Sequence, residues 1–346
     1  MTDLNQDKPI TISKISGLEP IKEHWDSLTA DYFQTAGFIE HLQKYNFCNQ
    51  RYYLLYESDI LKAGAIVYTL PVNLLTFSNK ELKIKMNVIG IAASVDSSGI
   101  IGDPLYFDQL VAEILSREKG IILCLNYNGE ISVPGIVKLQ TLPTVIFKHD
   151  FNNYETYLRS MRHHYRRRMV QAAAKFSNVE TITGSCLAFS DEHYKLYLNI
   201  LLRSKTKLET LSSDFFKNLN SDFTLTSYYT KDKVLLTWHI TCSYCEAYSF
   251  LFGGINYESR DEFEGYYNNL LGIIKEAIEK GFKTVNLGQT AEIPKMRVGG
   301  KLVSKRLFLY HHNSLIQLLL KLFRPMLEYK QKSKPLNVFK HENTVR

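Results

Sequence analysis

One pattern occurs twice in this chain: an amphipathic helix, then a glycine, then a short apolar strand. The first copy reads LVAEILSREKGIILCLNYN and the second LLGIIKEAIEKGFKTVNLG, which aligns Gly120 with Gly281. Each copy follows a β-hairpin pattern whose polar turn falls at Asp59 or at Asp232. This recurrence predicts a duplicated α/β unit with a mixed sheet and an insertion in one copy. Chance repetition of common helix-strand pairs is the alternative.

Length and composition set the scale of the fold. The chain has 346 residues, 45% hydrophobic and 22% charged, so two domains of about 150 residues are expected. Its five cysteines are scattered and odd in number, which argues against a disulfide framework and for a reducing compartment. The N-terminal sequence lacks a secretory signal pattern, and no run reaches the ~18 apolar residues of a membrane span. We therefore expect a cytoplasmic protein.

Positive charge is concentrated in two stretches of the sequence. Residues 159–175 include six basic residues and no acidic one, and residues 295–346 include twelve basic residues against Glu328 and Glu342. The remainder is acidic overall, although the formal net charge of the whole chain is +7. This distribution predicts binding of an anionic ligand at particular places, with a solvated basic surface as the alternative for the C-terminal stretch.

The first basic stretch has the spacing of a helix. Apolar and aromatic residues recur at helical intervals from Leu158 to Phe176 and predict one helix with a buried stripe. Arg162 and Arg166 lie on a neighbouring face, where guanidinium groups can pair with phosphate or carboxylate oxygens. A solvated basic helix or a nucleic-acid-binding helix would explain the same pattern.

Two short motifs in the second half carry candidate chemistry. Gly253 and Gly254 follow an aromatic-rich strand, and we expect them in a strand-to-helix loop, either as an anion-binding turn or as a simple β-turn. Lys295 lies between a strand that ends at Gly288 and the pair Gly299-Gly300. A lysine in such a strand-to-loop position is either solvent-exposed or a point charge for a phosphate or an oxyanion.

Four segments carry a resemblance to a known family: MRHHYRRRMVQAAAKF, YSFLFGGINYE, YYNNLLGIIKEAIEKG and VNLGQTAEIPKMRVGG. In their order and spacing they resemble the GNAT-type acyltransferase domain of the FemAB-like group, which includes Fem-type aminoacyltransferases and related bacterial acetyltransferases. The resemblance is specific from Tyr157 to Tyr310 and architectural before that. It implies two tandem GNAT-like domains of mixed-sheet α/β class with a cleft between them.

The resemblance also implies a division of the chain and a function. We expect a degenerate GNAT-like domain over residues 1–148, a GNAT-like acyltransferase domain over 149–312, and a basic amphipathic C-terminal helix and tail over 313–346. The implied enzyme is an N-acyltransferase that uses acyl-CoA as co-substrate and acylates an amine of a small molecule or cell-envelope precursor. The alternatives are aminoacyl-tRNA-dependent transfer to a peptidoglycan precursor, and a non-catalytic module that binds an anionic ligand or a membrane surface.

One departure from the family pattern concerns the binding of an acyl-CoA donor. The usual Arg/Gln-x-x-Gly-x-Gly/Ala phosphate loop of GNAT folds is absent, as it also is in Fem-type enzymes. Acidic residues follow Gly254 where phosphate would lie, at Glu258, Asp261, Glu262 and Glu264. These acidic residues favour the non-catalytic alternative.

Site residues follow from the resemblance and from residue type. The resemblance implies that Lys295 contacts a phosphate of the acceptor, with Arg297 as a weaker partner, and that Arg162 and Arg166 border the substrate cleft. Tyr257 is a candidate acid toward a leaving thiolate, and His239 is a candidate base for the amine proton. A histidine within an apolar strand is, alternatively, a packed core residue.

Other motifs point to no metal or redox cofactor. Cys242 and Cys245 are three residues apart in a predicted strand, so their side chains face opposite sides, and no second pair accompanies them. The adjacent pairs His163-His164 and His311-His312 share no helical face.

The C-terminal sequence SLIQLLLKLFRPMLEY, residues 314–329, predicts an apolar helix flanked by basic residues. This helix is expected either to cover the second domain as a terminal cap or to lie on an anionic membrane surface.

Overall fold

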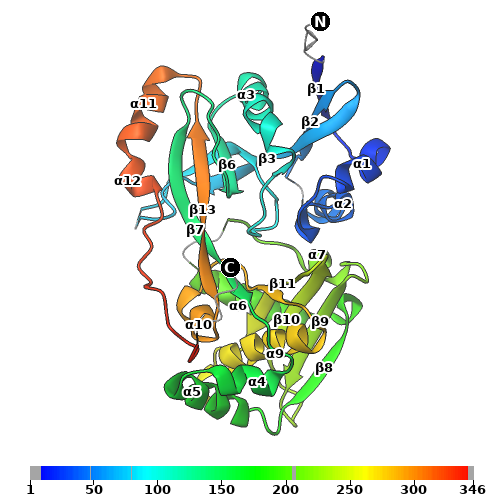
Figure 1. Ribbon diagram of the computed structural model, residues 1–346, viewed down its shortest axis with the longest axis vertical. Coiled ribbons are helices and arrows are strands. Elements are labelled where there is room, and N and C mark those ends of the chain that lie inside the picture. The colour runs from blue at the N-terminus through cyan, green and yellow to red at the C-terminus, as the bar shows by residue number, and fades with distance from the viewer. Residues whose placement is uncertain (1–8, 47, 79, 205–207, 342–346) are drawn as a thin grey trace, which may run out of the picture. The chain divides into compact units, whose positions relative to one another are not determined.

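A computed structural model of the chain describes residues 9–46, 48–78, 80–204 and 208–341. The chain forms two compact units: unit 1 is Met1–Thr141 with Lys305–Lys330, and unit 2 is Leu142–Ser304 with Gln331–Arg346 (Figure 1). Two strands, β7 (Val137–Lys148) and β13 (Lys301–Tyr310), each begin in one unit and end in the other. The observed division therefore differs from the boundaries expected at residues 148 and 312, because the chain returns to unit 1 along β13 and leaves it again after Lys330.

Unit 1 is a mixed sheet in the order β1-β2-β3-β4-β6-β13-β7, with β5 paired to β3. Its remaining strands are β1 (Ile10–Ile15), β2 (Arg51–Glu57), β3 (Ile60–Asn73), β4 (Lys83–Ile89), β5 (Ile100–Gly102) and β6 (Ile122–Tyr127). Its helices are α1 (Lys22–Asp26), α2 (Ala36–Tyr45), α3 (Phe107–Arg117), α11 (Ser314–Leu322) and α12 (Arg324–Leu327).

The two faces of the unit 1 sheet are covered by different helices. Tyr53 faces the apolar stripe of α3 in one core cluster. The next residue back, Tyr52, points to the other face, where its ring packs edge-on against Trp25 of α1 at 6.0 Å. Trp25 lies so close to Gly64 that a Cβ at that position would stand 2.6 Å from the indole. The absence of a side chain at Gly64 therefore makes room for the tryptophan ring.

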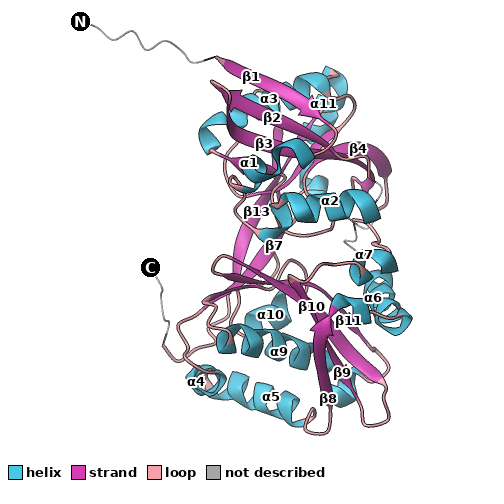
Figure 2. Cartoon of the chain, turned by 90° about the vertical axis from the view of Figure 1, so that its right-hand side faces the viewer, coloured by secondary structure: helices cyan, strands magenta, loops and turns pink. Residues whose placement is uncertain are grey.

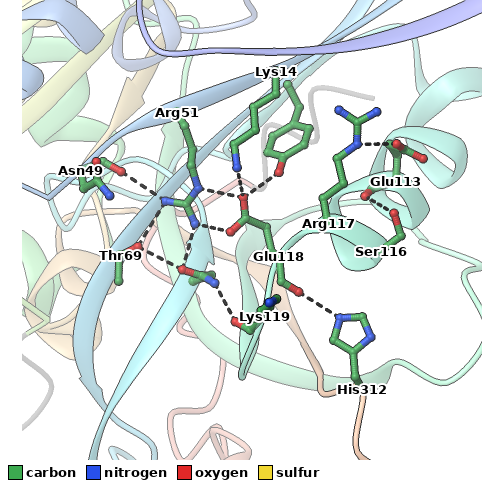
Figure 3. Close-up of polar contacts among 12 residues, drawn as sticks. Lys14, Asn49, Arg51, Thr69, Glu113, Ser116, Arg117, Glu118, Lys119 and His312 are labelled. Carbon is green, nitrogen blue, oxygen red and sulfur yellow. Dashed lines mark hydrogen bonds and ion pairs between the residues drawn. The ribbon is translucent and has the colours of Figure 1, made fainter.

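A buried carboxylate ties the start of unit 1 to the end of α3 (Figure 3). Glu118, 5% exposed, accepts hydrogen bonds from Arg51 Nε at 2.8 Å, Tyr53 Oη at 2.6 Å and Lys14 Nζ at 3.0 Å. Burial alone would raise the pKa of this carboxyl, but the three donors lower its pKa to about 2. His312 donates from Nε2 to the Glu118 backbone carbonyl oxygen at 2.9 Å.

The strands of unit 2 belong to the same mixed sheet and follow in the order β13-β7-β12-β11-β10-β9-β8. Its remaining strands are β8 (Glu180–Ser185), β9 (Phe223–Tyr229), β10 (Leu235–Tyr244), β11 (Ala247–Ile255) and β12 (Thr284–Asn286). Its helices are α4 (Tyr154–Ser160), α5 (His163–Ala174), α6 (Asp191–Arg203), α7 (Ser213–Lys217), α8 (Arg260–Phe263), α9 (Gly265–Glu279) and α10 (Glu292–Arg297).

Helices lie on both faces of the unit 2 sheet. Figure 2 shows α9 on one side of the strands and α6 with α7 on the other. The α9 side is an apolar core that includes Phe147, Ile273 and Val285. On the other side, Phe216 and Trp238 pack with ring centroids 6.0 Å apart.

The duplicated helix-glycine-strand pattern is confirmed. In unit 1, α3 connects the parallel strands β4 and β6; in unit 2, α9 connects the parallel strands β11 and β12. Gly120 has φ +78° and Gly281 has φ +82°, values that favour glycine. At Gly281 the reason is local, because its N–H bonds to the Ile278 carbonyl and the next N–H, of Phe282, bonds to the Ala277 carbonyl. This is the Schellman arrangement that ends a helix.

Two sequence expectations about helices are corrected. The stretch predicted as one helix from Leu158 to Phe176 is broken into α4 and α5, because Met161 and Arg162 are extended and Met161 forms a β-bridge with Phe339. The C-terminal helix is confirmed but belongs to unit 1 and not to the second domain, whereas the chain after it returns to unit 2. None of the helices in the described part of the chain has the length and apolarity of a membrane span.

Candidate functional site

The sheet of unit 2 opens where β11 and β12 diverge. The two strands pair only from Ala247–Thr284 to Ser249–Asn286. Beyond that point β11 stays paired with β10, with a shift in register between Ile240 and Thr241. The chain after β12 stays beside β7, because Val145 forms backbone hydrogen bonds with Leu287 and Gly288. Ligands of open α/β sheets bind beyond the carboxyl ends of strands that separate in this way.

Lys295 lies at this opening. It is in α10 and not in the expected loop, and it is only 2% exposed. Its Nζ donates to the Gln289 carbonyl oxygen at 2.6 Å and lies 5.8 Å from the ring centroid of Phe250 in β11. The prediction that Lys295 is in a loop is wrong because residues 292–297 coil into a short helix after two left-handed residues, Thr290 and Ala291. The side chain is a buried, positioned ammonium, which can stabilise negative charge that develops nearby.

A cationic cavity of about 730 Å³ lies elsewhere in unit 2, next to α10. One wall is a face of α5 with residues at positions i, i+3, i+4 and i+7: His164, Arg167, Arg168 and Gln171. These residues are exposed, because α5 buries Met169 and Ala172 on its other side. The helix face is therefore free for a ligand.

The other walls of the cavity come from α10 and from the chain near the C-terminus. Ile293, Met296 and Arg297 of α10 line it, as do Lys332 and Lys334. Among the described residues, no carboxylate lines the cavity and none forms an ion pair with its arginines or lysines. Five full positive charges without an internal counterion give this cavity a strong preference for anions.

Tyr267, in the first turn of α9, holds two of the cavity arginines. The guanidinium of Arg168 lies over the Tyr267 ring, 4.7 Å from the centroid. Arg297 Nη1 donates to the Tyr267 hydroxyl at 3.0 Å. Tyr267 is 7% exposed, so its own position is fixed by the core around it. The two guanidinium groups are thus preorganised, which reduces the entropy lost when they bind a ligand.

The sequence predicts Arg162, Arg166 and Arg297 as anion-binding residues, but the structure does not place all three at one site. Arg297 lines the cavity, whereas Arg162 and Arg166 do not. Arg162 precedes the first turn of α5 and donates from Nε to the Phe339 carbonyl oxygen at 3.1 Å. The break at Met161 removes Arg162 from the helix, and the exposed face is set by residues 164, 167, 168 and 171. That spacing was present in the sequence and was the signal that could have identified Arg167 and Arg168.

Gly253 and Gly254 are not in a loop. Both lie within β11 and pair with His239 and Trp238 of β10. A Cβ on Gly254 would overlap the indole nitrogen of Trp238 and stand 2.7 Å from Leu196 Cβ, and one on Gly253 would stand 2.8 Å from the Trp238 carbonyl oxygen. The expected strand-to-helix loop is therefore wrong at these positions. Glycine is needed here because a large buried side chain approaches the strand closely.

His239 and Tyr257 lie in different surroundings. His239 is fully buried, with Nε2 3.5 Å from Glu276 Oε1, the position of a packed core histidine. Burial would raise the pKa of Glu276, but contacts with His239, Tyr248 and Thr226 lower this pKa to about 2. Tyr257 is partly exposed after β11, with the Arg203 guanidinium 4.0 Å from its ring centroid. The structure shows no contact of either residue with Lys295 within the described chain.

The acidic stretch after Gly254 is partly neutralised by its neighbours. Arg260 Nε pairs with Asp261 at 2.8 Å, and Lys175 Nζ lies 3.8 Å from Glu264. In the part of the chain that the structure describes, no group of three His, Cys, Asp or Glu side chains is arranged to hold a metal ion. Cys242 is buried in β10 and Cys245 is exposed at the turn that follows.

The chain is thus built from two α/β units, and solved structures that include a tandem GNAT protein share this fold. FemX has the same fold, with a TM-score of 0.55 at 13% identity over 89% of this chain and 100% of FemX. L-PGS from Bacillus licheniformis superposes with a TM-score of 0.54 at 13% identity, over 89% of this chain and 97% of its own. A tandem GNAT protein from the clavulanic acid biosynthesis pathway matches with a TM-score of 0.51 at 7% identity, over 87% and 98%.

The likenesses confirm the predicted fold, a mixed-sheet α/β architecture of two GNAT-like units. Comparison of the sequence with protein-family models gave no match. A search of curated proteins also found no match.

Proposed function

We propose that the protein is an N-acyltransferase that transfers an acyl group from acyl-CoA to an amine of a small molecule or cell-envelope precursor. The observation that carries this proposal is the position of α10. This helix presents Arg297 to the cationic cavity on one side and Lys295 to the opening between β11 and β12 on the other. One rigid element thus connects a site suited to phosphates with a buried positive charge at the end of the parallel strands.

The chemistry needs few groups from the protein. The amine nitrogen attacks the thioester carbonyl carbon, negative charge develops on the carbonyl oxygen, and the carbon–sulfur bond breaks as the CoA thiolate leaves. The amine loses a proton, which passes to the thiolate through water or through Tyr257, the partly exposed candidate acid. Lys295 supplies positive charge for the oxyanion or for an acceptor phosphate. The cavity arginines hold the donor phosphates, so that binding and orientation provide most of the catalysis.

Aminoacyl-tRNA is the second candidate donor, with a peptidoglycan precursor as acceptor. The observation that favours it is the exposure of the cavity wall on α5, since His164, Arg167 and Arg168 are open to solvent and can follow a polynucleotide backbone. The bond that breaks is then the ester to the tRNA hydroxyl, and the attacking group is the same amine.

Both versions of the proposal place the reaction in the cytoplasm. The cysteines support this location, because all five are outside disulfides and four of them are buried, which fits a reducing compartment.

Thermal unfolding with each donor separates the candidates. Acetyl-CoA, a longer acyl-CoA, CoA and aminoacyl-tRNA are compared, and the true donor at 100 times its Kd should add about 2.7 kcal/mol of stability. Arg167→Ala and Arg297→Ala should each weaken donor binding about tenfold or more, since each removes a charged hydrogen-bond donor. Arg159→Ala is the matched control: this arginine is exposed, lies outside the cavity and pairs with Glu155.

Turnover by a Lys295→Met variant tests the chemical step. This variant keeps the length of the side chain and removes the charge, so we expect the donor to bind normally while the rate of transfer falls at least a hundredfold. Full activity in Lys295→Met would show that the reaction point is misassigned. Absence of binding by every donor would leave the non-catalytic alternative and would refute the enzyme proposal.

A further inference from the structure

Helix α11 exposes an apolar stripe to solvent. Leu315, Leu318, Leu319 and Leu322 follow one another at positions i, i+3, i+4 and i+7, and their exposed fractions are 64%, 51%, 42% and 65%. Phe323 extends the stripe at the end of the helix with 51% exposed. A helix that only caps a domain places polar residues on this side. A contiguous exposed apolar stripe indicates an interaction surface.

The opposite side of α11 shows that this orientation is fixed. Gln317 is buried, donates from Nε2 to the Gly135 carbonyl oxygen and accepts from the His311 N–H at 2.8 Å. Leu320 is buried one turn further on. The helix therefore buries its amide and exposes its leucines, the reverse of the usual arrangement. Contacts within unit 1 do not account for the exposed leucines.

Basic residues surround the stripe. Lys321, Arg324 and Lys330 are exposed along the same segment. Glu328 is the one acidic residue between Ser314 and Lys330, and it is engaged by Arg324 Nε at 3.5 Å and by the Gln140 N–H at 3.1 Å. Leucines beside lysines that have no acidic partner among the described residues suit the surface of an anionic bilayer. There the leucines can enter the acyl-chain region while the lysines contact the phosphate head groups above it.

The size of the surface distinguishes a membrane from a protein partner. A nine-residue helix is about 14 Å long and about 10 Å wide, so its face falls far short of the ~800 Å² per partner of a stable protein interface. A bilayer needs no complementary shape and accepts side chains one by one.

We propose that α11 is a peripheral docking helix for an anionic lipid membrane, with its leucines among the acyl chains and Lys321, Arg324 and Lys330 at the head groups. This role is independent of the acyl-transfer reaction. It places unit 1 on the lipid surface through a segment far in sequence from the cationic cavity wall on α5. Figure 1 shows α11 and α12 beside β7, at the margin of the unit.

Co-sedimentation of the full chain with lipid vesicles tests the proposal. Vesicles of phosphatidylcholine alone are compared with vesicles that also contain phosphatidylglycerol. We expect binding at least tenfold tighter with phosphatidylglycerol and a loss of most of that gain at high salt, because exposed charges are screened. The double variant Leu318→Ser/Leu322→Ser should weaken binding at least tenfold, and Lys321→Glu should weaken it only on the anionic vesicles.

The control is Leu105→Ser, which changes a leucine of unit 1 that is 86% exposed and lies outside α11. This variant should bind vesicles like the wild type, and all variants should unfold at the wild-type temperature. Equal binding by the double variant and the control would overturn the proposal, as would absence of binding to anionic vesicles. A concentration-dependent dimer that the double variant abolishes would also overturn it, since a second copy would then cover the stripe.

Discussion

The hydroxyl of Tyr267 accepts a hydrogen bond from Arg297 at 3.0 Å. The same ring supports the guanidinium of Arg168, so one buried tyrosine sets the spacing of two cations that come from helices distant in sequence. Neither arginine has an acidic partner among the described residues, and Tyr267 takes the place of a counterion as the group that orients them. This arrangement leaves both charges available to an anionic ligand.

Tyr267→Phe should loosen Arg297 without disturbing Arg168. The variant retains the ring and loses one hydrogen bond, so the affinity for pyrophosphate or for the donor should fall about three- to tenfold. The measurement is a calorimetric titration with pyrophosphate. Tyr266→Phe is the control, since the structure shows no hydrogen bond of that hydroxyl among the described residues. Unchanged affinity in Tyr267→Phe would contradict the positioning role, and a lower unfolding temperature would point to a structural role only.

Gly254→Ala should destabilise unit 2 because the added methyl group overlaps the indole of Trp238. Overpacking of this kind costs about 1–3 kcal/mol. Urea unfolding gives the free energy of unfolding for this variant and for Gly184→Ala, whose added Cβ would meet no heavy atom within 4 Å. We expect Gly184→Ala to remain near the wild-type value. If Gly254→Ala kept full stability and lost only ligand binding, the packing explanation of this glycine would be wrong.

The Glu118 cluster predicts acid sensitivity of unit 1. The carboxyl has a pKa of about 2 in the folded protein against 4.5 as the ordinary value, so the unfolded chain binds the proton more tightly. The stabilisation is complete above pH 4.5 and is lost as the pH falls toward 2, a change of about 3 kcal/mol.

Urea unfolding between about pH 6 and pH 2.5 measures this effect. Glu118→Gln should be less stable than the wild type at the upper end, and the difference should shrink toward the lower end. Glu113→Gln is the control, because Glu113 forms an exposed pair with Arg117 one helical turn away and such pairs contribute little. The same pH profile in both variants would exclude Glu118 as the source of acid sensitivity.

Local structure explains why much of the fold could be predicted. The turn after α9 depends on Gly281 alone, because its positive φ and the two hydrogen bonds around it involve residues within one helical turn. The hairpin turn at Ser58 and Asp59 has the same character, with φ values of 48° and 67°. All the residues that determine these turns lie within a few positions of one another, so a short stretch of sequence is enough to predict them.

The candidate site could be predicted only in part. The position of Lys295 and Arg297 after a strand predicts both as site residues, and both lie in α10. The sequence does not show that Arg297 faces the cationic cavity while Lys295 faces the opening between β11 and β12. Gly253 and Gly254 gave the pattern of a loop, and only the packing of Trp238 explains why they are in a strand. The proposed catalytic roles of these residues remain predictions.

By itself the sequence determined the duplicated helix-glycine-strand framework, since hydrophobic periodicity and glycine conformation act over a few residues. Only the tertiary structure decided the cavity, because its walls come from α5, α10 and the chain at Lys332 and Lys334, and their charges meet through packing around Tyr267. The exposed side of α11 was decided in the same way. Which face of a helix is buried depends on the residues that pack against it, and for α11 these are brought from far along the chain.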